Sequence, residues 1–270
     1  MNGRSRVAAW LRFGLIAGAF LVLVFVPPAL RGLLALLFPN GSNLLYPRAD
    51  ISLLVGEHVA MSAISSLLAA VVGIAAGITA TRPWAGSFAL VADRLAAAGQ
   101  TIPPAAVLVL SVPALGFGLA PTVAALFLYS ILPILRNTMS GLAGVDRDVV
   151  EAAAGMGMGP LSILFKVELP LAAPVIIAGI RTAVIVNIGT ATIGATIGAG
   201  GLGAPIIAGL VNQKPSFLAE GALVVALLAL VLDSLFAAIA GELPAQRATQ
   251  RAAAHQAAAQ AASTTTGTTS

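Results

Sequence analysis

This amino-acid sequence predicts an all-α membrane protein, a polytopic helical bundle of about six transmembrane helices. Of its 270 residues, 59% are hydrophobic and 9% are charged, whereas a soluble domain carries about 25% charged residues. Several apolar runs reach roughly 18 residues or more, long enough to cross a lipid bilayer as helices. These runs lack the period-two alternation of barrel strands, the other structure that satisfies a backbone in lipid. Helices are therefore expected throughout.

The composition excludes several kinds of functional site. The chain contains no cysteine, which rules out thiol catalysis, cysteine-ligated metals and disulfide bonds. Its two histidines, His58 and His255, lie far apart, so no metal site is expected, and no catalytic residue or cofactor is predicted. The 14 lysines and arginines give a net charge of +4 without forming a basic cluster. Membrane topology explains this charge better than nucleic-acid binding does.

Residues 1–53 are predicted to form an N-terminal segment with the first transmembrane helix and an external loop. Three arginines among the first twelve residues precede an apolar run, which is the outline of a signal peptide. The run continues past Pro27 and Pro28 to Phe38 without a clear small-x-small cleavage site. We therefore expect the first span to remain uncleaved.

The second span is expected from about His58 to Ala80, where Thr81-Arg82-Pro83 stops it. Its Gly73 and Gly77 have the GxxxG spacing that lets another helix backbone come close. We interpret this spacing as a site of tight helix packing.

Proline and loop composition define the later elements. Between residues 84 and 118, Pro103, Pro104 and Pro113 can each kink or end a helix, so the boundaries there are left open. The elements expected after this region are a span from about Leu119 to Leu135, a span from about Pro174 to Ile197, an external loop to Phe217, a span from about Leu218 to Ala240, and a low-complexity cytoplasmic tail over 241–270 that is predicted to be disordered.

The placement of lysine and arginine predicts the orientation of the bundle, because cytoplasmic loops are enriched in both residues. With both termini in the cytoplasm, Arg48 and Lys214 lie outside, Arg31 and Arg181 fall within spans, and the cytoplasmic segments hold Arg4, Arg6, Arg12, Arg82, Arg94, Arg136, Arg147, Lys166, Arg247 and Arg251. The cytoplasmic side still holds more lysines and arginines than the outside if the ambiguous Arg94 is assigned to the outside. The segment that joins the span ending at Leu135 to the span beginning at Pro174 is therefore predicted to face the cytoplasm.

A short helix is expected at the start of that segment. Asp148 and Glu151 have the D-x-x-E spacing of a helix start, with Asp148 able to cap the helix and Glu151 able to bond back to it. The helix should fail near Gly155 and Gly157, because each glycine weakens a helix by about 1 kcal/mol relative to alanine.

A second short helix should follow, with Pro160 in its first turn and Pro170 at its end. The surface of residues 152–154 is flat and made of alanine, flanked by Met156 and Met158. Small residues let a partner backbone approach, and methionine adapts to a partner surface. This composition leaves two alternatives, a docking site for another protein or a loop that folds back on its own helices.

The spacing of residues favours docking, because it matches a known pattern. EAA, three residues, glycine, nine residues and aliphatic-x-Leu-Pro are met by Glu151, Ala152, Ala153, Gly157, Val167, Leu169 and Pro170. This pattern resembles the EAA loop of binding-protein-dependent ABC-transporter permeases, which have the ABC type I permease fold. The departure is mild, with valine at position 167 where isoleucine is commonest in the family.

Further segments within residues 54–240 resemble one group of these permeases. TIPPAAVLVL, VELPLAAPVIIAGIRTA and NIGTATIGATIGAGGLG are similar to the permease subunits for osmoprotectants, which are quaternary ammonium compounds such as glycine betaine, carnitine and choline. Methionine-type permeases share the GAGGLG ending but are less similar around GIRTA and NIGTATI. Residues 54–240 are therefore expected to form the permease domain. A permease for another solute such as methionine is the alternative, and a secondary transporter is a more distant one.

The resemblance implies a set of partners. The chain would be one permease half in a bacterial cytoplasmic (inner) membrane, working with an ABC ATPase subunit, a second permease subunit that is identical or homologous, and an extracytoplasmic substrate-binding protein. Glu151, Ala152, Ala153 and Gly157 would form the ATPase-docking element, and Leu169-Pro170 would reconnect it to the next span. The chain lacks a GxxxxGK[ST] phosphate loop, so it is not expected to be an enzyme, and ATP would be hydrolysed on another polypeptide.

The span from Pro174 to Ile197 is unusually polar. Asn187, Thr190 and Thr192 are expected either to hydrogen-bond between helices or to line the translocation pathway, because polar groups inside a membrane face the bundle interior or a cavity. Arg181 has a conceivable partner in Asp233 of the last span. No aromatic cage for a quaternary ammonium cation is visible in the sequence.

One glycine motif resembles a nucleotide-binding sequence but lacks the expected surroundings. Gly198, Gly200 and Gly203 form G-x-G-x-x-G with Glu220 further on, as in a dinucleotide-binding fingerprint. The preceding segment is predicted to be a membrane helix, and no strand-turn-helix unit surrounds it. An external turn is expected there.

Overall fold

The structure is a computed structural model that describes residues 3–41, 43–86, 88–99 and 101–240. Within these residues the regular elements are all helical, as predicted, and the predicted tail over 241–270 lies outside them. The elements are α1 Gly3–Phe25, α2 Pro27–Leu37, α3 Ile51–Ala80, η1 Pro83–Ala85, α4 Phe88–Gly99, α5 Pro104–Leu115, α6 Leu119–Ala143, α7 Arg147–Gly155, α8 Pro160–Ile163, η2 Leu164–Glu168, α9 Leu169–Thr190, η3 Ala191–Ile197, α10 Gly203–Val211 and α11 Pro215–Ala240.

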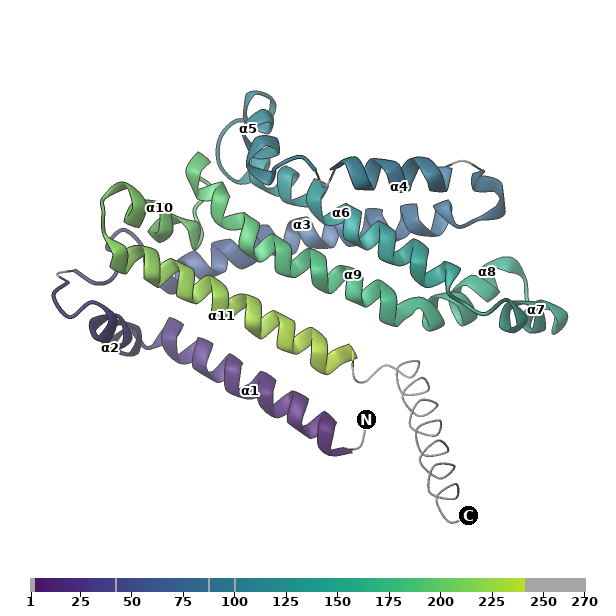
Figure 1. The fold of residues 1–270 in the computed structure, drawn as a ribbon, viewed down its shortest axis with the longest axis horizontal. Helices are drawn as coiled ribbons and strands as arrows, with labels where there is room; N and C mark the ends of the chain where they lie inside the picture. Colours follow the sequence, from purple (N-terminus) through teal and green to yellow (C-terminus); the bar gives the residue numbers. More distant parts are fainter. Residues whose placement is uncertain (1–2, 42, 87, 100, 241–270) are drawn as a thin grey trace, which may run out of the picture.

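In the described residues, five helical stretches are long and apolar enough to cross a membrane: Val7–Phe25, Ile51–Ala80, Leu119–Ala143, Pro160–Ile197 and Pro215–Ile239. Figure 1 shows the long helices α3, α6, α9 and α11 running lengthwise through one bundle, with α1 alongside α11. The α7–α8 segment lies at one end and α10 at the other, and we call these the α7 end and the α10 end.

The structure defines the helices between residues 84 and 118, whose boundaries the sequence left open, and it corrects several predicted boundaries elsewhere; the span predicted from Leu119 to Leu135 continues as α6 to Ala143. The region from 84 to 118 holds the two short helices α4 and α5, because Pro103 and Pro104 interrupt the helical path and α5 restarts with Pro104 in its first turn. α3 begins at Ile51, before the predicted His58. The predicted external loop up to Phe217 contains α10, since GAPIIAGLV is apolar enough to fold back on α11.

The first apolar run also divides into two helices. Val26 has a non-helical conformation between α1 and α2, and Pro27 and Pro28 open α2 because proline lacks the N–H that a helix interior requires. Both helices belong to the bundle. Phe20 and Val24 of α1 and Leu30 and Leu34 of α2 lie in one buried cluster with residues of α3 and α11.

Glycines hold the central helices close together, as the GxxxG spacing predicts. A Cβ atom on Gly73 would lie 3.0 Å from Ile134 Cγ2 of α6, and one on Gly77 would lie 2.6 Å from Thr138 Cβ. Both glycines are buried. The predicted tight packing of this helix is therefore confirmed, with α6 as the neighbour.

An ion pair joins α9 to α11 within the bundle. The Arg181 Nε atom donates to Asp233 Oδ1 at 2.8 Å, and Arg181 Nη2 makes a second short contact to the same oxygen. The predicted pairing is confirmed. An unpaired charge in a membrane span is costly, and the pairing lowers this cost for both Arg181 and Asp233.

Candidate functional site

The candidate site is the hairpin α7–α8, where the sequence motif places Glu151, Ala152, Ala153 and Gly157. α7 begins after Asp146, whose side-chain oxygen Oδ1 accepts a hydrogen bond from the Asp148 N–H at 3.0 Å. The prediction that Asp148 caps this helix is therefore wrong. Asp146 takes that position because it has an extended ψ of 127° and directly precedes the first helical residue, while Asp148 lies in the first turn.

The end of α7 explains why the motif requires glycine at 157. Gly157 N–H donates to Ala154 O at 2.9 Å, and Met158 N–H donates to Ala153 O at 3.2 Å. This pair of bonds is a Schellman motif, in which the residue after the cap adopts a left-handed conformation. Gly157 has φ +82°, a conformation that glycine adopts without steric cost. The predicted failure of the helix near Gly155 and Gly157 is confirmed.

The second half of the hairpin differs from the prediction. Pro160 opens α8 as expected, but Pro170 does not end a helix. The chain passes through η2, a π-helical turn in which Leu169 N–H donates to Leu164 O, and continues directly into α9. Pro170 is tolerated because it lies in the first turn of α9 after this wider turn, where its missing N–H breaks no regular helical bond.

One face of the hairpin is anchored in the bundle. Ala153 is 3% exposed, and Leu164 packs in a buried cluster with Leu142 of α6 and Ala172 and Ile176 of α9. Val167 and Leu169 of the motif are half-buried on this same connection. The hairpin is thus packed against α6 and α9.

The other face of the hairpin is exposed and largely apolar. Met156 is 76% exposed, Leu161 72%, Phe165 63% and Val149 43%. The motif residues Glu151, Ala152 and Pro170 are also exposed. Large apolar side chains exposed together on one short segment are typical of a contact site for a protein or a membrane. We call the exposed residues Val149, Glu151, Ala152, Met156, Leu161 and Phe165 the hairpin surface.

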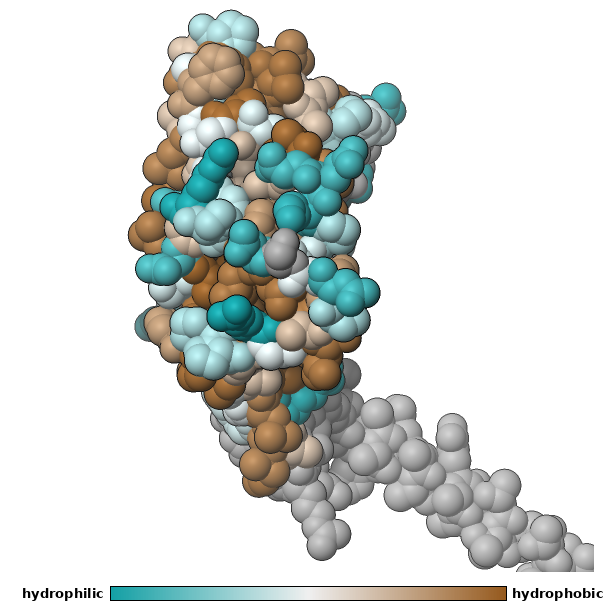
Figure 2. All heavy atoms as spheres, turned by 90° about the vertical axis from the view of Figure 1, so that its left-hand side faces the viewer, coloured by the Kyte–Doolittle hydropathy of each residue, from teal (hydrophilic) through white to brown (hydrophobic). Residues whose placement is uncertain are grey.

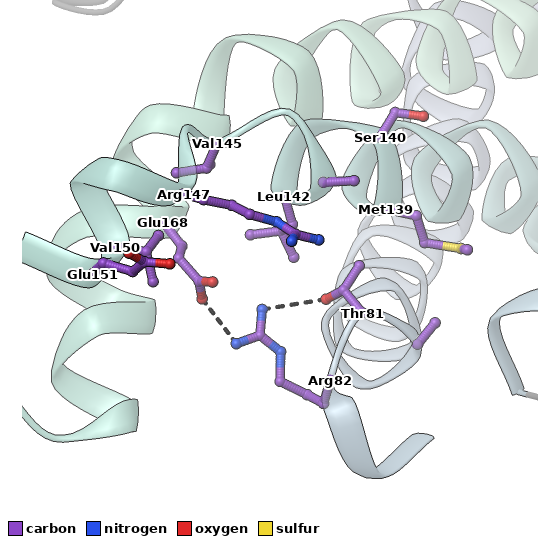
Figure 3. A pocket seen from close by; sticks show the side chains of 12 residues that line it. Thr81, Arg82, Met139, Ser140, Leu142, Val145, Arg147, Val150, Glu151 and Glu168 are labelled. Atoms are coloured by element: carbon purple, nitrogen blue, oxygen red, sulfur yellow. Dashed lines mark hydrogen bonds and ion pairs between the residues drawn. The ribbon is translucent and has the colours of Figure 1, made fainter. Parts of the chain in front are cut away.

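A salt bridge that sequence analysis did not identify links the hairpin to α3. Arg82, just beyond the end of α3, approaches Glu168 of η2, with Arg82 Nη1 2.8 Å from Glu168 Oε2. Arg82 also donates from Nε to Ile78 O. Its Nη2 atom donates to Thr81 Oγ1 (Figure 3), and together these bonds fix the orientation of its guanidinium. The two side chains are 21% and 14% exposed, so the pair is only partly screened by water.

A cavity of about 720 Å³ lies beside this salt bridge. Its lining comes from the ends of α3 and α6, from α7 and from η2, and includes Arg82, Ser140, Arg147, Glu151 and Glu168. The cavity lies between Arg147, Val150 and Glu151 of α7 and the end of α3. The hairpin therefore contacts the bundle through a few defined points, namely its buried face and the Arg82–Glu168 pair.

The three predicted pathway residues lie further along α9 and in η3. Asn187 is fully buried and donates from Nδ2 to Ser66 Oγ at 2.9 Å and to Ser65 Oγ at 3.1 Å, both on α3. Thr190 and Thr192 are half-buried, and Thr192 Oγ1 donates to Gly189 O at 2.7 Å. Asn187 thus makes interhelical hydrogen bonds in this chain, and a pathway role for the three residues stays a prediction.

The glycine-rich segment 198–203 is a packed turn at the α10 end. The Gly201 N–H donates to Glu57 Oε2 at 2.8 Å, and Gly198, Gly200 and Gly201 all have positive φ. No strand precedes this turn in the described part of the chain, so it lacks the surroundings of a dinucleotide site. Among the same described residues, no group of three or more potential metal ligands comes together.

Comparison with known proteins adds to this geometry. The family model for "Binding-protein-dependent transport system inner membrane component" matches residues 69–243. The choline transport system permease protein OpuBB of Bacillus subtilis (strain 168) is 42% identical over 198 residues, covering 73% of this chain and 87% of that protein. The osmoprotectant import permease protein OsmY of Salmonella typhimurium is 42% identical over 191 residues, covering 70% and 80%.

Solved structures share the fold. A chain of the MetNI methionine ABC transporter in an inward-facing conformation matches with a TM-score of 0.64 and 23% identity, covering 72% of this chain and 95% of that chain. A chain of an amino acid ABC transporter matches with a TM-score of 0.55 and 19% identity, covering 72% and 91%. At these identities the likeness concerns the arrangement of helices.

Proposed function

Because this chain belongs to the family of binding-protein-dependent inner membrane components, as an ABC permease subunit of the osmoprotectant group, we propose that it conducts quaternary ammonium solutes through the membrane. The chain is a multi-pass membrane protein and a transport subunit, with ATP hydrolysed on a separate subunit. Relatives that transport choline, glycine betaine and carnitine support the solute class.

The hairpin surface is the proposed docking site for the ATPase subunit. The observation that carries this proposal is an exposed apolar face on a segment whose opposite face is packed into the bundle. A rigid attachment is required, because a force applied by a partner to a loose loop would not reach the spans. Through η2, movement of the hairpin passes directly into α9, and through Arg82–Glu168 it passes into α3.

The proposed orientation places both termini and the α7 end in the cytoplasm and the α10 end outside. Arg82, Arg136, Arg147 and Lys166 all lie toward the α7 end, in agreement with the enrichment of basic residues on the cytoplasmic side. A substrate-binding protein would then deliver solute at the α10 end. A second permease subunit, identical or homologous, would complete a pathway to which Asn187, Thr190 and Thr192 contribute.

Uptake measurements test the proposed solute. In a strain deleted for this gene, we expect loss of labelled choline or glycine betaine uptake and unchanged methionine uptake, with uptake restored by the plasmid-borne gene. Loss of methionine uptake alone would favour a methionine permease, the alternative solute assignment. Uptake that persists without any ATPase subunit would instead indicate a secondary transporter.

Charge substitution tests the docking site. We expect Glu151→Lys and Gly157→Asp to leave membrane insertion intact while abolishing transport and weakening co-purification of the ATPase subunit. Asn212→Lys is the control for ATPase co-purification alone, because Asn212 is an exposed residue at the α10 end, where the substrate-binding protein is proposed to deliver solute. If both hairpin variants transported like the wild type and co-purified the ATPase like Asn212→Lys, the docking proposal would be wrong while the solute assignment remained standing.

A further inference from the structure

A second cavity, of about 290 Å³, lies at the α10 end between the N-terminal helices and the start of α11. Its lining comes from three parts of the chain: the junction of α1 and α2, residues 45–52, and the first turns of α11. Its size is close to the lower limit of about 300 Å³ for pockets that hold small molecules. Figure 2 looks onto this end, where hydrophilic side chains are spread among apolar ones.

A buried carboxylate lines this cavity. Glu220 is 3% exposed, and in the described part of the chain it receives one hydrogen bond, from the Tyr46 N–H to Oε2 at 2.7 Å. The same residues offer its other oxygen no partner and form no ion pair with it. A carboxylate with this little exposure and one neutral donor is only partly compensated when it is charged. A cation in the cavity would supply it.

The rest of the lining suits a cation with an apolar body. Asp50 contributes a second carboxylate, which makes no capping hydrogen bond to α3. Phe25 and Tyr46 add aromatic side chains, and Tyr46 is held in place by an edge-to-face contact with Phe217 at 5.9 Å between ring centroids. Arg31 and Arg48 are exposed and do not line the cavity. Carboxylates together with aromatic faces attract alkylammonium groups.

We propose that this cavity binds a small organic ammonium cation through Glu220 and Asp50, at a site separate from the hairpin and from the α9 polar residues. The cation could come from solution or from the headgroup of a phospholipid such as phosphatidylethanolamine, since both carry the same chemistry. The inference rests on the cavity and not on the proposed function, although a solution ligand would belong to the proposed solute class.

Equilibrium binding to the full-length purified chain, without a substrate-binding protein, tests a ligand from solution. Radiolabelled choline is the probe, and 3,3-dimethylbutan-1-ol, its neutral isostere, is the competitor control. We expect saturable choline binding that the neutral isostere does not displace, weakened at least about tenfold by Glu220→Gln, the scale expected when one charged partner is lost. Asp50→Asn should also weaken choline binding. Because Asp50 is exposed, this second variant tests the site even if the buried substitution Glu220→Gln disturbs folding.

Native mass spectrometry of the same chain tests the lipid source. Protein reconstituted with phosphatidylglycerol and phosphatidylethanolamine should retain the ethanolamine lipid, and Glu220→Gln should lose it. Glu57→Gln is the matched control, a carboxylate at the same end that does not line the cavity. Choline binding assigns the site to a solution cation, and lipid retention assigns it to a headgroup. If the wild type, Glu220→Gln and Asp50→Asn did not differ toward either ligand, the site would not exist, whatever the transport assays showed.

Discussion

Two glycine-rich turns, residues 155–159 and residues 198–203, look alike in the sequence but differ in packing. A Cβ atom on Gly155, Gly157 or Gly159 would meet nothing within 4 Å. A Cβ atom on Gly201 would lie 3.0 Å from Met61 Cε, and one on Gly203 would overlap the backbone oxygen of Thr192. The first turn needs glycine for one backbone angle and leaves its surface free. The second needs glycine for the positive φ angles of Gly198, Gly200 and Gly201, and at Gly201 and Gly203 also for space. The turn at 155–159 therefore has room for a partner protein at its surface. The turn at 198–203 is packed against other parts of this chain.

The largest expected effect follows from the packed turn. Gly203→Ala places a methyl group against the Thr192 carbonyl and 2.8 Å from Ala195 Cβ, and no side-chain rotation relieves a clash with the backbone. We expect a loss of stability of about 3 kcal/mol, at the upper end of overpacking costs, seen as a lower melting temperature and yield of the detergent-solubilised protein. Gly189→Ala is the control, since nothing lies within 4 Å of its added methyl group. Equal stability of the two variants would contradict the comparison.

A smaller effect is expected at the salt bridge that anchors the exposed turn. Arg82→Ala and Glu168→Ala should each reduce stability by about 2 kcal/mol, because the remaining charge loses a partner in a partly buried site. In a double-mutant cycle measured by thermal unfolding, the two losses should not add. Additive losses would mean that the pair does not act as a unit, and the proposed path from the hairpin to α3 would fail.

The smallest effect is expected in the exposed turn itself. Gly157→Ala should cost about 1 kcal/mol because alanine is strained at φ +82°, and Gly157→Asn should cost less because asparagine tolerates this conformation. Gly159→Ala should change nothing, since its φ is −72° and its surroundings are open. The three variants can be compared by melting temperature. A large loss for Gly159→Ala would show that this turn is packed like the other one.

The sequence predicted local features of these regions better than contacts between distant ones. The hairpin, its glycine end and the GxxxG packing follow from residues close together in the chain. The Arg82–Glu168 pair joins residues 86 positions apart, and composition gives no means of pairing them. The π-helical turn before Pro170 was missed because proline usually marks a helix end, while here the wider turn absorbs it. Glu220 and Phe25 meet at one cavity only because α1 and α11 pack together.

The central claim is that the hairpin surface docks the ATPase subunit, and crosslinking tests it most directly. The chain contains no cysteine, so a single cysteine at Ala152, on the exposed face of α7, or at Leu210, which is 59% exposed in α10, attaches a maleimide–benzophenone crosslinker at one known position of this chain. In membranes containing the whole transporter, Ala152→Cys should crosslink to the ATPase subunit and Leu210→Cys should not. Crosslinking from Leu210→Cys, or none from Ala152→Cys in an actively transporting complex, would contradict the claim.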